Sequence, residues 1–252
     1  MTNIHILPAF SDNYMYLIEH EGAVAAVDPA EPGSVVDLLD KNDLKLAMVI
    51  NTHHHHDHVS GNLDLKNRFG CEVVGPDDGR IPGLDRPVKE GDVVDFAQGL
   101  QVLETPGHGR SDLSFYLPPG ESKGAVFTGD TLFVGGCGRL FECGPDVMWA
   151  SLSRLAELPD ETEVYCGHEY TLSNYRFARS LDPGHELFKT RFDEVKALRD
   201  RNQPTIPSTI GQEKASNPFL QADKAGMKQA LNMDGADPAD VFGELRHRKD
   251  IF

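Results

Sequence analysis

The sequence is poor in cysteine, in long apolar runs and in basic residues near its start, and each shortage excludes a class of protein. The four cysteines are scattered and form no Cys-x-x-Cys pair, so we expect reduced, packed thiols and no disulfide framework. No apolar run approaches the roughly 18–20 residues that a membrane-spanning helix needs. Residues 1–20 lack the basic and apolar regions of a secretory signal. We therefore expect a cytoplasmic protein without a membrane partner.

Positive charge is scarce along the whole chain. The 24 lysines and arginines are outnumbered by 40 aspartates and glutamates, which gives a formal net charge of −16. Nucleic-acid binding needs a basic surface, so this balance argues against nucleic acid as the main partner. An anionic small molecule would in turn need a locally basic pocket. The 252 residues suffice for one large domain or for a domain with a smaller appendage.

Residues 1–168 alternate short apolar segments with turns and helices. The apolar segments have the length of strands, and several end in a polar residue. They lie at 3–7, 14–20, 23–29, 46–50, 71–75, 100–106, 113–118, 124–130 and 162–166. Helices are expected at 33–42, 61–69 and 145–159, the first with Ser34 as its cap. This order predicts an αβ domain built on mixed sheets.

After about residue 169 the pattern becomes helical. Apolar residues at helical spacing predict helices at 170–182, 185–201, 223–233 and 237–249. Residues 202–220 contain several prolines and are expected to be extended. The sequence thus predicts two domains, 1–168 and a smaller helical one at 169–252.

The most unusual segment is "NTHHHHDHVSG" at 51–61, directly after an expected strand. In extended backbone, residues separated by one position project to the same side, so His53 and His55 can share an ion. Asp57 and His58 follow where the chain turns into a helix and can face a second ion. Zinc and similar ions favour imidazole nitrogen and carboxylate oxygen as ligands. A tag or a solvated loop is the alternative, but a tag would stand at a terminus.

Three further candidates follow strands in the same way. His108 comes after "VLETPG", Asp130 after "VFTG" and His168 after "VYCG". Each alone is explained as a turn or cap residue, but αβ sheets gather functional groups at the carboxyl ends of their strands. Seven ligands suit two ions with one carboxylate shared between them. The sequence therefore predicts a dinuclear metal site.

This ordered set resembles the signature of the metallo-β-lactamase superfamily, Thr-His-x-His-x-Asp-His followed by His, Asp and His. Further segments are similar to those of one family within it, glyoxalase II (hydroxyacylglutathione hydrolase), and come in that family's order. They are "DNYMYLI", "TPGH", "FTGDTLFVGGCGRLFE", "VYCGHEYT", "NPFL" and "RHRKDIF". The resemblance covers nearly the whole chain. It implies an α+β fold, the αββα sandwich of the superfamily, followed by a C-terminal α-helical domain that binds glutathione.

The resemblance also implies a ligand set for two divalent metal ions. By it, one ion is held by His53, His55 and His108, the other by Asp57, His58 and His168, and Asp130 bridges them. His54 and His56 match no ligand position. Zinc is the ion expected first, with iron or manganese as alternatives. Asp57 could in addition orient a metal-bound hydroxide.

The implied reaction is the hydrolysis of S-(2-hydroxyacyl)glutathione thioesters, with S-lactoylglutathione as the typical substrate, in the second step of methylglyoxal detoxification. Two ions that bridge a water lower its pKa toward neutrality, and the resulting hydroxide suits attack on a thioester carbonyl. The sequence contains no Gly-x-Ser-x-Gly elbow and no cysteine at a nucleophile position of the family. We therefore expect direct hydrolysis without an acyl-enzyme.

For substrate binding, the resemblance implies five residues: Arg139, Phe141, Tyr170, Arg246 and Lys249. The last two belong to "RHRKD", a basic island in an acidic chain, and glutathione carries carboxylates. The chain departs from the family pattern at Phe141, where some members have tyrosine, at Cys143, where glycine is commoner, and in "GHGRSD" around His108. These departures affect substrate affinity and turn geometry more than the type of reaction.

Three alternatives remain open. The chain could be another thioesterase or a lactonase of the superfamily, and a nuclease relative is disfavoured by the charge. A non-catalytic metal-binding protein would need the histidine run but would not explain His108, Asp130 and His168. For the enzyme we expect a monomer whose partner is a glutathione thioester.

Overall fold

The computed structural model describes residues 2–120, 123–182 and 184–252. By its packing the chain forms two compact units, one of Met1–Glu104 with Ser111–Gly129 and one of Thr105–Arg110 with Asp130–Phe252. These units divide the chain at a different point from the domains expected at 1–168 and 169–252, because residues 130–168 pack with the helices that follow them. No helix in the described ranges has the length and apolar character to cross a membrane.

The first unit contains a sheet of six strands that follow one another in chain order. They are β1 (Thr2–Ala9), β2 (Asn13–His20), β3 (Ala23–Val27), β4 (Lys45–Ile50), β5 (Glu72–Pro76) and β6 (Arg86–Val88). The first three strands pair antiparallel, and β3, β4, β5 and β6 pair parallel, so the sheet is mixed as expected. β4 lies inside the sheet and ends directly before the histidine run.

Two helices of this unit, α1 (Pro32–Asn42) and α3 (Asn62–Phe69), supply apolar side chains to the core of the sheet. Leu39 and Leu65 are fully buried there against strand residues such as Val49. The prediction that Ser34 caps the first helix is wrong, because α1 begins at Pro32 with Glu31 as its cap residue. Proline suits the first helical position, where its missing N–H is no loss, so the helix begins earlier than the serine indicated.

The remaining strands of the first unit pair antiparallel in sequence order. They are β7 (Val93–Val94), β8 (Leu100–Glu104), β9 (Leu113–Leu117) and β10 (Ala125–Gly129). β9 and β10 are buried along their whole length, which explains why both are mostly apolar and contain no charged residue. β10 ends directly before Asp130, as the sequence predicted.

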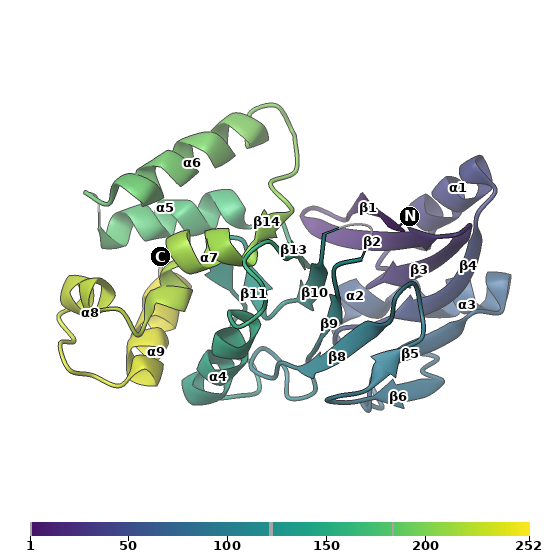
Figure 1. Ribbon diagram of the computed structural model, residues 1–252, viewed down its shortest axis with the longest axis horizontal. Helices are drawn as coiled ribbons and strands as arrows, with labels where there is room; N and C mark the ends of the chain where they lie inside the picture. Colours follow the sequence, from purple (N-terminus) through teal and green to yellow (C-terminus); the bar gives the residue numbers. More distant parts are fainter. Residues whose placement is uncertain (1, 121–122, 183) are drawn as a thin grey trace. The chain divides into compact units, whose positions relative to one another are not determined.

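The second unit is mostly helical. Its elements are β11 (Leu132–Phe133), β12 (Gly136–Cys137), α4 (Pro145–Leu155), β13 (Glu163–Cys166), α5 (Thr171–Leu181), α6 (Glu186–Arg199), β14 (Ser208–Thr209), α7 (Ile210–Ser216), the 3-10 helix η1 (Pro218–Gln221), α8 (Ala225–Leu231) and α9 (Pro238–Asp250). In Figure 1, α5 and α6 lie side by side. α9 contacts α4 and η1.

The expectation that residues 202–220 are extended is wrong for half of that segment, which contains α7 and η1. Side chains start both helices: the Thr209 hydroxyl accepts a hydrogen bond from the Gln212 N–H at 3.2 Å, and Asn217 Oδ1 accepts one from the Phe219 N–H at 3.0 Å. Helices this short carry too few turns for apolar periodicity to show. The threonine and asparagine caps were the signals available in the sequence.

A buried polar network holds the β11–β12 hairpin. Glu213 of α7 is fully buried, and its carboxylate accepts hydrogen bonds from the Gly135 N–H at 2.8 Å and from the Ser208 hydroxyl at 2.7 Å. The Asn217 side-chain amide donates to the Gly136 carbonyl at 2.9 Å and to Glu213 at 3.0 Å. Burial raises the pKa of the Glu213 carboxyl, and the donated hydrogen bonds act in the opposite direction. The hairpin conformation is therefore set by side chains nearly eighty positions later in the chain.

We predict that Glu213→Gln lowers the free energy of unfolding by roughly 1–3 kcal/mol, because the amide cannot accept from all the donors that surround it. Urea denaturation followed by circular dichroism measures the change. Glu161→Gln is the control, since Glu161 is exposed and its replacement should alter stability by less than about 0.5 kcal/mol. Equal effects of the two substitutions would show that the buried network contributes nothing beyond charge.

Candidate metal centre

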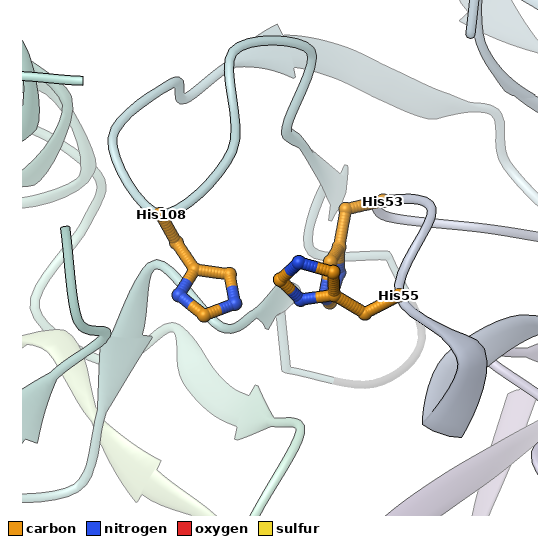
Figure 2. A group of neighbouring side chains, drawn as sticks. All are labelled: His53, His55 and His108. Atoms are coloured by element: carbon orange, nitrogen blue, oxygen red, sulfur yellow. The ribbon is translucent and has the colours of Figure 1, made fainter. Parts of the chain in front are cut away.

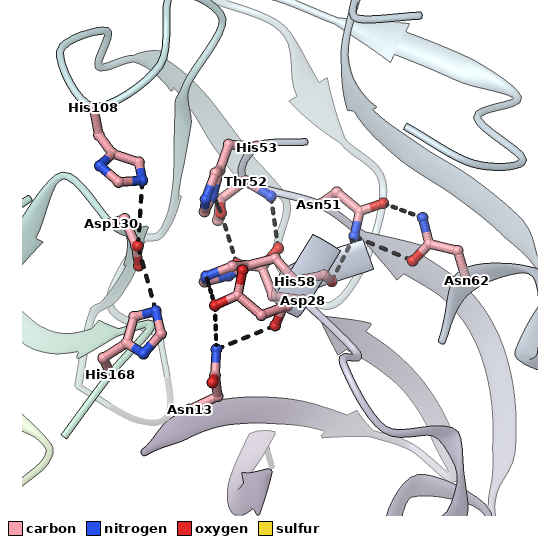
Figure 3. Close-up of polar contacts among 11 residues, drawn as sticks. Asn13, Asp28, Asn51, Thr52, His53, His58, Asn62, His108, Asp130 and His168 are labelled. Carbon is pink, nitrogen blue, oxygen red and sulfur yellow. Dashed lines mark hydrogen bonds and ion pairs between the residues drawn. The ribbon is translucent and has the colours of Figure 1, made fainter. Parts of the chain in front are cut away.

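The loop that carries the first ligands is fixed at both of its ends. Asn51 follows β4, and its N–H donates to the Val74 carbonyl of β5 at 2.8 Å. Its side chain exchanges hydrogen bonds with that of Asn62 at the start of α3, at 2.7 and 3.3 Å (Figure 3). Both asparagines are fully buried. Buried amides that satisfy each other in this way hold the following residues in one conformation.

Asp28 orients two residues of the same loop. It follows β3, is 3% exposed and accepts hydrogen bonds from the Thr52 N–H at 2.8 Å and the Thr52 hydroxyl at 2.6 Å. Its Oδ2 also accepts from His58 Nδ1 at 3.0 Å (Figure 3). Both carboxylate oxygens are thus engaged with donors, which makes Asp28 an orienting residue even though it lies within 4.8 Å of ligand atoms of His53 and His58.

Sequence reasoning missed Asp28. The signal was present, because "AVAAVDP" places this aspartate after an apolar strand, as "VFTGD" does for Asp130. The same rule that selected Asp130 would have selected Asp28.

The histidines of the run face different partners. The rings of His53 and His55 have centroids 4.8 Å apart, and Figure 2 shows the two side chains leaving the loop after β4 toward each other. His53 Nδ1 bonds the Thr52 hydroxyl at 3.0 Å. The His54 ring turns instead toward Asp78, with its Nδ1 3.6 Å from Asp78 Oδ2. His56 is exposed at the first position of α2 (His56–Val59).

Asp57 is held by the sheet. The side-chain amide of Asn13, the first residue of β2, donates to Asp57 Oδ2 at 2.9 Å and to the Asp57 carbonyl at 3.2 Å. The same Oδ2 lies 3.8 Å from His58 Nε2. Asn13 is buried and was not among the expected site residues, although it lies within the "DNYMYLI" segment.

The second unit holds the other three expected ligands. Asp130 Oδ2 lies 3.4 Å from His108 Nε2 and 3.4 Å from His168 Nε2, so one oxygen faces both rings (Figure 3). His108 Nδ1 donates to the Arg139 carbonyl at 2.9 Å. Gly138 makes this approach possible, because a Cβ there would overlap the Asp130 carbonyl oxygen.

These donor sets fit metal ions by their chemistry and spacing. Ligands bound tetrahedrally at about 2.0–2.1 Å lie roughly 3.4 Å from one another, which agrees with the spacing around Asp130 Oδ2. In His53, His58 and His108, Nδ1 is engaged by an oxygen, which fixes the tautomer and directs Nε2 to the ligand role. The histidine and aspartate clusters are typical of a dinuclear metal site. Nitrogen and carboxylate donors suit zinc, iron and manganese alike.

Two aromatic residues expected to bind substrate lie beside the ligands of the second unit. The Phe141 ring is 61% exposed and lies 5.0 Å from the His108 ring. Tyr170 stacks on His168 at 4.7 Å with an interplanar angle of 3°. Cys143, the other departure near this loop, is a free thiol 3.7 Å from the Gly109 carbonyl.

The three expected cationic residues gather at the end of α9. Arg139 is largely exposed, whereas the Arg246 side chain is 6% exposed and donates to the Cys137 carbonyl at 2.9 Å. The Lys249 amine donates to the Ser173 hydroxyl at 2.9 Å. Burial, followed by the nearby Arg246 and Arg139 guanidinium groups, lowers the pKa of Lys249 to about 8. Arg248 pairs with Glu244 and does not contribute to this cluster.

Comparison with known proteins gives two family matches that together span nearly the whole chain. Residues 10–168 match the model described as "Metallo-beta-lactamase superfamily", and residues 169–252 match "Hydroxyacylglutathione hydrolase C-terminus". Proteins described as hydroxyacylglutathione hydrolase are similar from end to end. That of Rippkaea orientalis is 47% identical, with 98% of each chain covered. That of Methylococcus capsulatus is 45% identical, with 100% of this chain and 99% of that one covered.

Solved structures show the same fold. ETHE1 from Myxococcus xanthus superposes with a TM-score of 0.67 at 28% identity, with 99% of each chain covered. TTHA1623, solved in a di-iron-bound form, gives a TM-score of 0.61 at 28% identity and covers 86% of this chain and 98% of that one. The expected fold class, a metallo-β-lactamase fold followed by a helical region, is confirmed.

The different surroundings of His54 and His55 lead to a prediction about metal content. His55→Ala should lower both the metal bound per chain and the turnover, because it removes an imidazole whose ring lies beside that of His53. His54→Ala is the matched control and should leave metal content near that of the parent, because its ring faces Asp78. Elemental analysis after dialysis against a metal buffer measures the difference. Equal loss of metal in the two variants would contradict the ligand assignment.

Proposed function

Because the chain belongs to the hydroxyacylglutathione hydrolase family of the metallo-β-lactamase superfamily, we propose that it hydrolyses S-(2-hydroxyacyl)glutathione thioesters, typically S-lactoylglutathione. It is an enzyme, a metal-dependent hydrolase of thioesters. The observation that carries the proposal is the helical family model at residues 169–252, which follows the superfamily model in the same chain. The products are glutathione and a hydroxy acid, as in the second step of methylglyoxal detoxification.

We assign the metal ligands as the family signature places them. One ion takes His53, His55 and His108, the second takes Asp57, His58 and His168, and Asp130 bridges. The position of Asp130 Oδ2, equally far from His108 and His168, supports the bridging role. The neighbour solved in a di-iron-bound form supports the presence of two ions, which we propose to be zinc, with iron or manganese as alternatives.

When bound, the two ions would polarise the thioester carbonyl and lower the pKa of a water molecule. The chain's own residues orient the groups around them. Asn13 fixes the Asp57 carboxylate, which we propose also orients the nucleophile, and the Arg139 carbonyl fixes the His108 ring. The leaving thiolate of glutathione needs no strong acid to protonate it. Direct hydrolysis therefore requires no protein nucleophile.

The cationic cluster at the end of α9 supplies the locally basic pocket that a chain of net charge −16 needs for an anionic substrate. We propose that Arg139, Arg246 and Lys249 bind the carboxylates of glutathione. Phe141 and Tyr170 border the metal ligands His108 and His168 and would pack on the tripeptide. Tyrosine in place of Phe141 would add a hydroxyl that this chain lacks.

We also propose that the enzyme works as a monomer in the cytoplasm. All four of its cysteines are free, as expected of a reducing compartment. Size-exclusion chromatography with light scattering tests the monomer directly, because a dimer would have twice the chain mass of 27.8 kDa.

The function is tested with the purified protein, loaded with zinc, iron or manganese and assayed with S-lactoylglutathione. We expect turnover that disappears after chelation and returns with metal. Two further substrates, a lactone and a small thioester without glutathione, distinguish the alternatives. Hydrolysis of those compounds without activity on the glutathione thioester would favour another enzyme of the superfamily. Tight metal binding without any hydrolysis would favour a non-catalytic protein.

The lowered pKa of Lys249 predicts a pH dependence of substrate affinity. Its ammonium form, which attracts carboxylates, predominates below pH 8, and the neutral amine predominates above it. The KM for S-lactoylglutathione should therefore rise as the pH increases through 8. In Lys249→Arg the guanidinium keeps its charge, so this rise should be much smaller. An identical pH profile of KM in the two proteins would contradict a contact between Lys249 and the substrate.

Removing the charge of Lys249 tests its contact with the substrate in a second way. Lys249→Ala should lower kcat/KM for the glutathione thioester roughly 3- to 100-fold at pH 7, with the lower end expected where water screens the site. A small thioester without carboxylates provides the comparison within each protein. Equal losses on both substrates would mean that Lys249 supports the fold and does not bind glutathione.

A further inference from the structure

One carboxylate, that of Asp250, lies in the cationic cluster formed by Arg139, Arg246 and Lys249. Asp250, the last residue of α9, places Oδ1 3.0 Å from Arg246 Nη2 and 3.2 Å from Arg246 Nε. The same oxygen lies 3.6 Å from Arg139 Nε. A single carboxylate oxygen between two guanidinium groups has the arrangement that a substrate carboxylate would take there.

The cluster contains more positive than negative side chains. Arg139, Arg246 and Lys249 bring three cations together, and Asp250 is the carboxylate that contacts the two arginines. Crowding of like charges is visible in Lys249, whose pKa is lowered by burial and then by both guanidinium groups, while Asp250 acts in the opposite direction. The cluster keeps a surplus of positive charge, so a second carboxylate is attracted to it, and Asp250 weakens that attraction.

A ligand carboxylate can take the place of the Asp250 carboxylate beside the two arginines. Arg246 has other anchors, since it donates to the Cys137 carbonyl at 2.9 Å and its guanidinium lies 5.2 Å from the centre of the Phe219 ring. Asp250 and Arg139 are 39% and 65% exposed, so both side chains can move without disturbing the core. A ligand carboxylate could therefore replace Asp250 at the guanidinium groups while Arg246 stays in place.

We propose that Asp250 lowers the affinity of the site because it competes with the carboxylates of glutathione for Arg139 and Arg246. This inference rests on the proposed function. Substrate and product carry the same glutathione moiety, so an internal competitor weakens the binding of both by a similar factor. A hydrolase whose product keeps the whole recognition group benefits from such a residue, because product would otherwise stay bound. Because Asp250 lowers the affinity for the glutathione moiety, the product glutathione dissociates more readily.

The chain provides a matched pair of variants on one helix. Asp250→Asn and Glu244→Gln each remove one negative charge from α9 and one ion pair of i,i+4 spacing, Arg246–Asp250 in the first and Glu244–Arg248 in the second. Asparagine is isosteric with aspartate and can still accept a hydrogen bond from Arg246. The two variants change the net charge equally, and only the first changes the cluster that binds glutathione.

The measurements are the dissociation constant of glutathione by calorimetry and the KM for S-lactoylglutathione, both at low and moderate salt. In Asp250→Asn both constants should fall roughly 2- to 10-fold, with the smaller change at higher salt. In Glu244→Gln both should stay within about twofold of the parent. The pH at which KM rises should also move lower in Asp250→Asn, because the residue that raises the pKa of Lys249 is gone.

Three results would overturn the inference. Weaker glutathione binding by Asp250→Asn would show that Asp250 holds the arginines in their binding positions. Equal gains in both variants would show that net charge alone matters. A variant that does not fold would show that Asp250 is a permanent counter-ion of buried Arg246. A parent enzyme that neither binds glutathione nor hydrolyses its thioesters would instead disprove the proposed function, so the two failures are distinguishable.

Discussion

The carboxylate of Asp28 is the interaction on which the ligand geometry of the first unit depends. It is 3% exposed, and a charge buried that deeply must be surrounded by donors. The donors are the Thr52 N–H, the Thr52 hydroxyl and His58 Nδ1, and the Thr52 hydroxyl in turn accepts from His53. The end of β3 thereby sets the orientation of two rings that come from the loop after β4. Asp28 thus links the orientations of His53 and His58, directly in the case of His58 and through Thr52 in the case of His53.

In the second unit, backbone carbonyls orient the functional side chains. The Arg139 carbonyl orients His108, and the Cys137 carbonyl anchors Arg246, so one short segment contacts both a proposed metal ligand and the cations proposed to bind glutathione. The β11–β12 hairpin that begins this segment is held by the buried side chains of Glu213 and Asn217. Helical residues far along the chain thus hold the backbone of the hairpin that precedes Arg139. This dependence gives a physical reason why contacts group residues 130–168 with the helices.

The acidic composition of the chain contrasts with the cationic cluster at the end of α9. In a chain of net charge −16, the cations gathered at the end of α9 form a locally basic place. Burial, and after it the nearby Arg246 and Arg139 guanidinium groups, lowers the pKa of Lys249 to about 8. Asp250 acts in the opposite direction on that pKa, and we propose that it lowers the affinity for glutathione as well.

The sequence by itself determined the type of fold and the candidate ligands. Apolar periodicity located most strands and helices, and the spacing of His53, His55, Asp57 and His58 indicated a metal site, because both signals are local and follow from backbone geometry. It missed α7 and η1, which are too short to show a period and are specified by their caps. Only the tertiary structure decided which residues orient the ligands and which carboxylate opposes the cations. Asp28 and His58 are 30 positions apart and Arg246 and Cys137 are 109 apart, and no local pattern encodes pairs that meet only when the chain packs.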